Sequence, residues 1–248
     1  MNGSEIAKGG FDNEQDVADR FNNWKSDPYA QAWLRTMMYN LDEIADIKAE
    51  RIGEKGFKSD VNVLIKIKAK KSGEYKDCIE NLQIKLASTK NGYNQVEKTK
   101  VEKYRTQWHM PNEVVKLLQL FDGELPPDRD SLQSNRLFAN EFTASEQKTL
   151  VDWLQKNMLM IVGDVIRGRG RFAAEWTLVI HKWNGYRWTL KAVNEAIGIY
   201  CGDLKAEITP KGSLRLGRIT LQRKGGDNGR DTANMLQFKA DPIDLFDK

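Results

Sequence analysis

An alternating pattern of apolar side chains fixes one strand of the sheet that this 248-residue chain must build. β-Branched residues occupy every second position from 61 to 67, and most positions between them are polar. A period of two indicates a half-buried strand, because successive side chains point to opposite faces. The polar stretch 70–77 then predicts a hairpin loop, and residues 79–86 predict the returning strand.

Helical periodicity surrounds this hairpin. Residues 11–24 share an apolar face, and Asp12 with Gln15 fits a capping box. A second helix starts at Asp27-Pro28 and keeps an apolar stripe as far as Ala45. Further helices are predicted at 95–107, 114–120, 143–155, 191–199 and near Thr232, and further strands at 174–182, 186–190, 204–209 and 218–223. The pattern predicts an α/β fold with a central mixed sheet flanked by helices.

Charge is balanced overall but unevenly distributed. The chain has 39 basic and 35 acidic residues, and a net charge of +4 alone does not indicate a nucleic-acid partner. Basic residues gather at 66–71, 167–171 and 215–230, whereas acidic residues dominate 1–54 and 241–247. Basic patches on a balanced protein suit a polyanion that is bound and then released.

Several classes of protein find no support in the sequence. No apolar run is long enough for a membrane span, and we expect no secretory signal. Cys78 and Cys201 lack zinc spacing, and we expect two reduced thiols in a cytoplasmic protein. The two histidines form no metal motif, and neither a P-loop nor a dinucleotide-binding fingerprint is present.

Three polar residues at one end of the predicted hairpin could carry chemistry. Asp60 precedes the first strand, and Gln83 and Lys85 stand two apart on the second, so that both point to one face. A carboxylate, the Gln83 amide oxygen and the Ile84 backbone carbonyl are ligands that Mg²⁺ accepts, and Lys85 could orient a water that attacks a phosphodiester. The alternative is a set of solvated polar residues on an edge strand.

Eight stretches of the chain resemble a known enzyme family. They occur in order at 10–24, 40–44, 58–63, 83–86, 92–95, 123–127, 167–176 and 217–242. The last two, RGRGRFAAEW and GRITLQRKGGDNGRDTANMLQFKADP, are long and specific. They resemble the HinP-type family of small monomeric type II restriction endonucleases, which cut GCGC and are similar in fold to the MspI enzyme.

This resemblance implies the PD-(D/E)xK restriction-endonuclease-like fold, with Gln in place of the usual Glu. The catalytic positions fall on Asp60, Gln83 and Lys85. The hairpin between Asp60 and Gln83 is longer than in the relatives, but extra residues at a hairpin tip need not move the strand ends. No second acid stands beside the lysine. Glu14 on the first helix is a candidate additional metal ligand, and the alternative is a charge that faces solvent.

Tyr93, Asn94 and Gln95 form the first segment expected to contact DNA. They directly follow the predicted catalytic strand. The resemblance suggests that the aromatic ring wedges between base pairs and that Gln95 fills or reads the disturbed step. The relatives have Phe where this chain has Tyr93.

The glycine-rich stretch 222–230 is the second segment expected to contact DNA. Its Arg and Lys side chains match the O6 and N7 acceptors of guanine, and its Asp matches cytosine N4. The side chains concerned are Arg223, Lys224, Asp227, Asn228 and Arg230. The alternative is a tight turn with solvated flanks. Arg167, Arg169 and Arg171 are expected to bind phosphate, with a solvated loop as the alternative.

With the resemblance, the sequence predicts one endonuclease domain over 1–248, with 1–110 as the catalytic half and 160–248 mainly recognising DNA. The expected partners are double-stranded DNA and a methyltransferase of the same specificity in the host, without a physical complex. We expect Mg²⁺ as cofactor, no membrane association, and a monomer or weak dimer. Two alternatives stay open: a repair nickase of the same superfamily, and a DNA-binding protein without catalysis.

Overall fold

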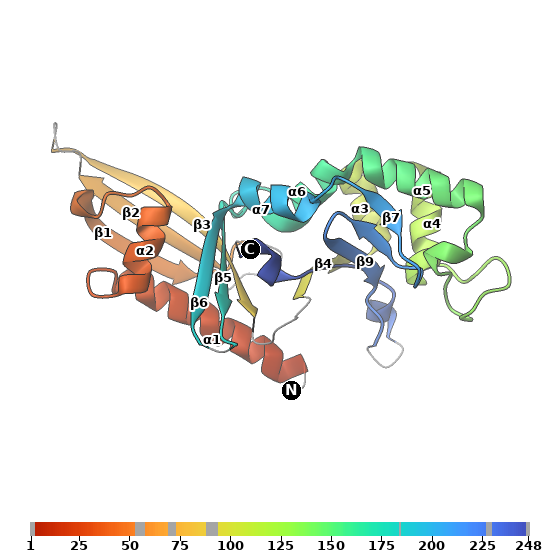
Figure 1. Cartoon of the computed structure of the whole chain (residues 1–248), viewed down its shortest axis with the longest axis horizontal. Helices are drawn as coiled ribbons and strands as arrows, with labels where there is room; N and C mark the ends of the chain where they lie inside the picture. Colours follow the sequence, from red (N-terminus) through yellow and green to blue (C-terminus); the bar gives the residue numbers. More distant parts are fainter. Residues whose placement is uncertain are drawn as a thin grey trace. The chain divides into compact units, whose positions relative to one another are not determined.

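The computed structural model of the protein describes residues 3–52, 58–68, 73–87, 94–183, 185–226 and 230–246, with the backbone alone at 3–9 and 231. The chain divides into two compact units (Figure 1). Unit 1 comprises 1–92, 166–196 and 245–248, and unit 2 comprises 93–165 and 197–244. The halves expected from the sequence, 1–110 and 160–248, have other bounds, and their roles in catalysis and recognition stay predictions.

Unit 1 is built on a five-stranded mixed sheet. Its strands run in the order β1 (Ile44–Arg51), β2 (Val61–Lys68), β3 (Tyr75–Ala87), β5 (Trp176–His181) and β6 (Arg187–Ala192). The neighbours β3 and β5 are parallel, and the other pairs are antiparallel. The predicted hairpin is confirmed, because β2 pairs with β3 and Val61 lies opposite Leu82.

Two helices share a hydrophobic core with one face of this sheet (Figure 1). They are α1 (Gly3–Asn22) and α2 (Pro28–Thr36). Phe21 and Trp33 bring the largest side chains, and both are fully buried in the same cluster as Val61 and Leu82. The predicted start of α2 is confirmed, since the Asp27 side chain accepts hydrogen bonds from the first backbone N–H groups of the helix.

Asn22, at the end of α1, ties this helix to the edge of the sheet. Its side-chain amide donates to Ala49 O (2.9 Å) and accepts from Ala49 N (2.7 Å). The strand β1 lies at the edge, so the amide supplies the two bonds that another strand would otherwise form. This contact fixes the position of α1 along the sheet.

The predicted ends of the first two helices are wrong. The helix α1 begins well before Asp12, so the pair Asp12 and Gln15 lies inside the helix and not at its cap. The helix α2 ends at Thr36, and the apolar stripe that reaches Ala45 passes through a 3₁₀ turn into β1. Met38 takes a left-handed backbone conformation (φ 68°), which a continuing helix cannot contain.

Unit 2 holds a second five-stranded sheet, antiparallel throughout. Its order is β4 (Asn94–Thr99), β10 (Leu236–Ala240), β9 (Ile219–Arg223), β8 (Leu214–Leu216) and β7 (Ala206–Ile208). Three of its helices are α3 (Val101–Trp108), α4 (Asn112–Asp122) and α5 (Ala144–Lys156). The remaining helices, α6 (Met158–Arg167) and α7 (Val193–Cys201), each contain a boundary between units. The Thr143–Glu146 capping box begins α5, where the sequence predicts the start of a helix.

The mixed α/β class is confirmed, but the described residues form two sheets where the sequence predicts one central sheet. The strand β4 replaces the start of the helix expected at 95–107, and β8 and β10 have no counterpart among the predicted elements. The strand β4 is a polar edge strand, and its conformation depends on pairing with β10 rather than on local preference. Within the described ranges, no helix has the length and apolar character needed to cross a membrane.

Replacing Asn22 by Ala should lower the free energy of unfolding by about 1–3 kcal/mol, because two backbone groups of Ala49 lose their partner. Urea unfolding followed by tryptophan fluorescence measures this loss. Asn23→Ala is the matched control, since the Asn23 amide donates only to Asp19 O on an exposed surface. Similar losses for the two variants would show that Asn22 does not anchor α1.

Candidate active site

The end of the β2–β3 hairpin places Asp60 against the backbone of β3. Asp60 N donates to Leu82 O (2.8 Å), and β2 starts at the next residue. The strand β3 continues past this point, so the N–H of Ile84 has no partner in β2. The Asp60 carboxylate takes that place, because Oδ2 accepts from Ile84 N at 2.6 Å. In an antiparallel pair a residue's N–H and C=O point to the same neighbour, so the Ile84 carbonyl also faces Asp60.

Gln83 and Lys85 lie on the face of β3 that alternation predicts, on either side of Ile84. Gln83 is only 3% exposed, and its side-chain amide makes no hydrogen bond within the described ranges. Lys85 forms no ion pair there either, but its positive charge lowers the pKa of Asp60, which burial raises. A buried amide and a nearby ammonium group are therefore available to an outside ligand.

Glu14 on α1 lies close to Asp60 and Lys85. Its side chain is 16% exposed and lies 3.5 Å from Arg51 on β1. Burial, and then the negative charge of Asp60, raise the pKa of Glu14 to about 7, while the charges of Arg51 and Lys85 lower it. The structure therefore brings Glu14 together with Asp60 and Lys85, although 45 residues separate Glu14 from the hairpin in sequence.

The donor set at this point suits a hard divalent cation. Two neighbouring carboxyl groups with raised pKa values, the Gln83 amide and the Ile84 carbonyl offer oxygen atoms alone, which Mg²⁺ and Ca²⁺ prefer. A cation would relieve the repulsion between Glu14 and Asp60. The part of the chain that the structure describes contains no group of three His, Cys, Asp or Glu side chains fit for a metal. The candidate set of two carboxylates, one side-chain amide and one backbone carbonyl offers oxygen ligands without a third acidic side chain.

The arginine-rich loop before β5 is attached to both catalytic strands. Ser59, directly before Asp60, donates to Phe172 O from its Oγ (2.9 Å) and from its backbone N (3.3 Å). Asn81, two residues before Gln83, donates to Arg171 O at 3.2 Å. Arg169 and Arg171 are exposed on this loop, and Arg167 is exposed at the end of α6, which leads into it. The geometry thus brings the predicted phosphate-binding arginines next to the candidate catalytic residues.

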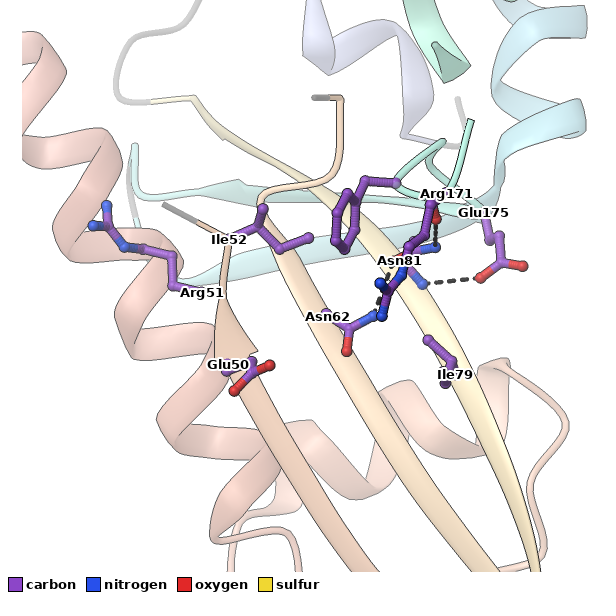
Figure 2. A pocket seen from close by; sticks show the side chains of 9 residues that line it. Glu50, Arg51, Ile52, Asn62, Ile79, Asn81, Arg171 and Glu175 are labelled. Atoms are coloured by element: carbon purple, nitrogen blue, oxygen red, sulfur yellow. Dashed lines mark hydrogen bonds between the residues drawn. The ribbon is translucent and has the colours of Figure 1, made fainter. Parts of the chain in front are cut away.

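A polar hollow of about 440 Å³ lies between this loop and the sheet (Figure 2). Its floor includes Asn62 and Asn81, which face each other on β2 and β3 and share a hydrogen bond of 3.0 Å. Its wall includes Arg171 and Phe172, with the Arg171 guanidinium 5.3 Å from the centre of the Phe172 ring. By alternation, Asn81 lies on the same face as Gln83, so the hollow adjoins the candidate site.

Sequence reasoning missed Arg51, Ser59 and Asn81. Ser59 and Asn81 are buried polar residues, at 3% and 8% exposure, and each stands within two positions of a predicted catalytic residue. That proximity is the only signal the sequence offers, since their partners Phe172 and Arg171 lie 113 and 90 residues away.

Unit 2 joins two of the segments expected to contact DNA through a chain of amides. Gln222 Nε2 on β9 donates to Gln237 Oε1 on β10 (3.3 Å), and Gln237 Nε2 donates to Gln95 Oε1 on β4 (2.7 Å). Gln237 is only 6% exposed. Sequence reasoning also missed Gln237, which links Gln95 to the 222–230 stretch.

The remaining candidates in unit 2 are only partly described. Asn94 begins β4 and is half-buried, and Arg230 is exposed. Arg223 ends β9 and donates to Asn234 Oδ1 from Nε (3.1 Å) and Nη2 (2.7 Å). Lys224 follows β9, and its backbone N donates to Met235 O. Tyr93, Asp227 and Asn228 lie outside the described residues.

Comparison with known protein families identifies the chain. The family model described as R.HinP1I restriction endonuclease matches residues 37–246. The chain belongs to the R.HinP1I restriction endonuclease family. It is therefore a type II site-specific deoxyribonuclease. A search among curated proteins gave no significant match.

A solved structure of restriction endonuclease MspI in complex with its cognate DNA has a similar fold. The TM-score is 0.62 at 14% sequence identity, over 92% of this chain and 87% of the MspI chain. At this identity the likeness supports the fold.

The metal-free protein should lose stability as the pH rises from about 5 to about 8. The folded pKa of Glu14, about 7, lies above its ordinary value of 4.5. The folded state therefore holds this proton more tightly than the unfolded state, and stability falls as the pH rises between the two values. Urea unfolding in EDTA at several pH values measures the effect, and Glu14→Gln should remove about 1–3 kcal/mol of the decline.

The control for this prediction is Glu113→Gln, which changes an exposed glutamate on α4. This variant should keep the pH dependence of the wild-type protein. A Glu14→Gln variant with an unchanged decline would show that Glu14 is not held beside Asp60.

Proposed function

We propose that this deoxyribonuclease cuts double-stranded DNA at a short GC-rich palindrome, GCGC, by Mg²⁺-assisted hydrolysis in a PD-(D/E)xK site. The observation that supports it most is the meeting of Asp60, Gln83 and Lys85 at one strand end, in a chain of this family. The MspI enzyme with the similar fold is bound to its cognate DNA, which supports duplex DNA as the substrate here.

Asp60, Gln83, the Ile84 carbonyl and Glu14 are the proposed metal ligands. When Mg²⁺ is bound, it supplies positive charge against the phosphate and lowers the pKa of a coordinated water. The bond from Ile84 N to Asp60 Oδ2 holds the carboxylate in one orientation and leaves Oδ1 for the cation. Arg51 forms an ion pair with Glu14 at 3.5 Å and so helps to hold it in place.

Lys85 is the proposed group that acts on the attacking water. Its ammonium group is close enough to Asp60 and Glu14 for its charge to lower the pKa of both. An ammonium there can donate to the water and orient it toward phosphorus. It can also stabilise the negative charge that builds on the phosphate in the transition state.

The DNA is proposed to be held from three segments. Arg167 and Arg169 contact phosphates, since both are exposed, at the end of α6 and on the following loop, and this loop is attached to the strands of the candidate site. Tyr93 wedges between base pairs, with Asn94 and Gln95 beside the disturbed step. The base-reading stretch carries Arg223, Lys224, Asp227, Asn228 and Arg230, with donors for guanine and an acceptor for cytosine.

The proposed cellular setting is the cytoplasm, where the DNA substrate is found. A methyltransferase of the same specificity would protect host sites without a physical complex. The protein is proposed to act as a monomer or weak dimer.

Asp60→Ala and Lys85→Ala should each reduce cleavage of plasmid DNA by roughly 10²–10³-fold or more, because each removes a group that acts on the water and the phosphate. Binding to a GCGC duplex in Ca²⁺ should stay close to that of the wild type. Gel analysis of plasmid cleavage and fluorescence anisotropy give the two readouts. The matched control is Lys66→Ala, since Lys66 is exposed on β2.

Near-normal cleavage by either Asp60→Ala or Lys85→Ala would remove that residue from the mechanism. A loss of DNA binding as large as the loss of cleavage would show that the residue contacts DNA instead.

Cleavage of one sequenced plasmid should give discrete fragments with Mg²⁺ and none with EDTA, and every end should map to GCGC. Methylation of a cytosine in the site should block cutting, because the proposed readout uses the cytosine edge in the major groove. Ends at a site that contains A·T pairs would contradict the specificity. Cutting limited to mismatched or branched DNA would support a repair nuclease, and binding without cutting would support a non-catalytic protein.

A further inference from the structure

Two arginines of unit 2 lie close together without a carboxylate partner. Arg136 is half-buried in the segment between α4 and α5, and Arg223 is half-buried at the end of β9. Burial, and then the charge of Arg223, lower the pKa of Arg136. Neither guanidinium forms an ion pair within the described ranges. Two neighbouring, half-buried cations raise the free energy of the fold unless an anion accompanies them.

The segment that carries Arg136 and the end of β9 that carries Arg223 approach each other at one glycine. Gly123 ends α4 in a left-handed conformation (φ 86°). A Cβ atom added to it would lie 2.8 Å from Asn135 O, 3.2 Å from Asn234 Oδ1 and 3.4 Å from Arg223 Nε. Asn135, which precedes Arg136, and Asn234, which binds Arg223, therefore both lie close to Gly123. In addition, α4 packs on β9.

Neutral groups hold the Arg136 guanidinium in place. Its Nε donates to Gln133 Oε1 (3.2 Å), and its Nη1 lies 3.5 Å from Phe121 O. Its centre stands 4.0 Å from the centre of the Phe138 ring. These contacts orient the group and leave its charge uncompensated, and a guanidinium has five N–H donors, so further donors are available to an outside acceptor.

Arg223 is oriented in the same manner by Asn234, which accepts from Nε and Nη2. This occupies one edge of the guanidinium, and the edge formed by Nη1 and Nη2 is left for an outside group. The fixed, planar fork of an arginine matches the oxygens of a phosphate.

The nearest acidic groups are engaged elsewhere. The Glu141 carboxylate accepts from the backbone N of Leu132 and of Phe138, both at 2.7 Å. Asp122 accepts from Glu124 N (2.9 Å), and burial raises its pKa to about 7. Neither acid forms an ion pair with Arg136 or Arg223, although the charges of Glu141 and Asp122 raise the pKa of Arg136 against the effects of burial and Arg223.

We propose that Arg136 and Arg223 together bind one phosphate of the DNA backbone. The proposal rests on the proposed function, because it takes DNA as the ligand, and it adds a residue outside all the segments that the sequence singled out. The phosphate would lie beside the 222–230 stretch, since Arg223 begins its glycine-rich part. This gives Arg223 a phosphate contact in place of the base contact assigned to it above. The pair would fix the position of the 222–230 stretch along the duplex and would carry no base information itself.

The test measures the dissociation constants of two duplexes, one with GCGC and one without, in Ca²⁺ at several salt concentrations. Arg136→Gln should weaken binding of both duplexes by a similar factor, about tenfold at low salt. The slope of log affinity against log salt should fall by about 0.9, the value for one lost phosphate contact. Arg136→Lys keeps the charge and should keep most of the slope.

The charge-matched control is Arg105→Gln, because Arg105 is exposed on α3 and already ion-paired with Glu102. It should leave the slope unchanged. Thermal unfolding of each variant without DNA checks that the fold is intact, and Arg136→Lys keeps the test valid if Arg136→Gln unfolds.

Three results would overturn the proposal. An unchanged slope in a folded Arg136→Gln variant would make the pair structural. Weaker binding of the GCGC duplex alone would make Arg136 a base contact. Stabilisation of the wild type by inorganic phosphate, lost in Arg136→Gln while DNA binding is normal, would make the site one for free phosphate. If the proposed function is wrong, the wild-type protein will not cut at GCGC. That result is separate from the binding measurements on the variants.

Discussion

The hydrogen bond from Ile84 N to Asp60 Oδ2 determines the geometry of the candidate active site. It exists because β3 runs past the end of β2 and leaves one inward-facing backbone N–H without a strand partner. The Asp60 carboxylate takes the place of that partner, and the Ile84 carbonyl points to the same side of β3. Gln83 and Lys85 then flank this point by strand alternation alone. The end of the β2–β3 ladder thus brings together the residues proposed to hydrolyse the phosphodiester.

The rest of unit 1 keeps this strand end in place. The helix α1 is anchored to β1 by Asn22, and Arg51 holds Glu14 beside Asp60. Ser59 and Asn81 attach the arginine-rich loop to the same two strands. Burial raises the pKa of both carboxyl groups, so the site is strained electrostatically without a cation. If the proposed cation binds here, it relieves this repulsion.

Periodicity was enough to find the hairpin and the pair Gln83 and Lys85, because strand alternation is local information. The end of α2 and the strand β4 could not be found in this way. Met38 breaks a stripe that still looks helical, and the polar residues of β4 form a strand only through their partner β10. Helix and strand ends of this kind depend on tertiary contacts.

The candidate site was predictable to the same extent. The types and spacing of Asp60, Gln83 and Lys85 fitted both a nuclease site and a set of solvated polar residues, and the family resemblance favoured the nuclease site. Their catalytic roles stay predictions. For Glu14 the sequence allowed two interpretations, an additional metal ligand or a charge that faces solvent. Gln237 and Arg136 gave no signal, and Ser59 gave only its place next to Asp60, since each depends on a residue that is distant in sequence.

The most direct test of this account is a crystal structure of the wild-type protein with Ca²⁺ and a GCGC duplex. The account predicts an ion about 2.3–2.6 Å from an Asp60 carboxylate oxygen and from the Ile84 carbonyl. The scissile phosphate should lie against it on the side of Lys85. An ion bound away from Asp60 and Ile84, or a duplex whose backbone passes elsewhere, would contradict the central claim.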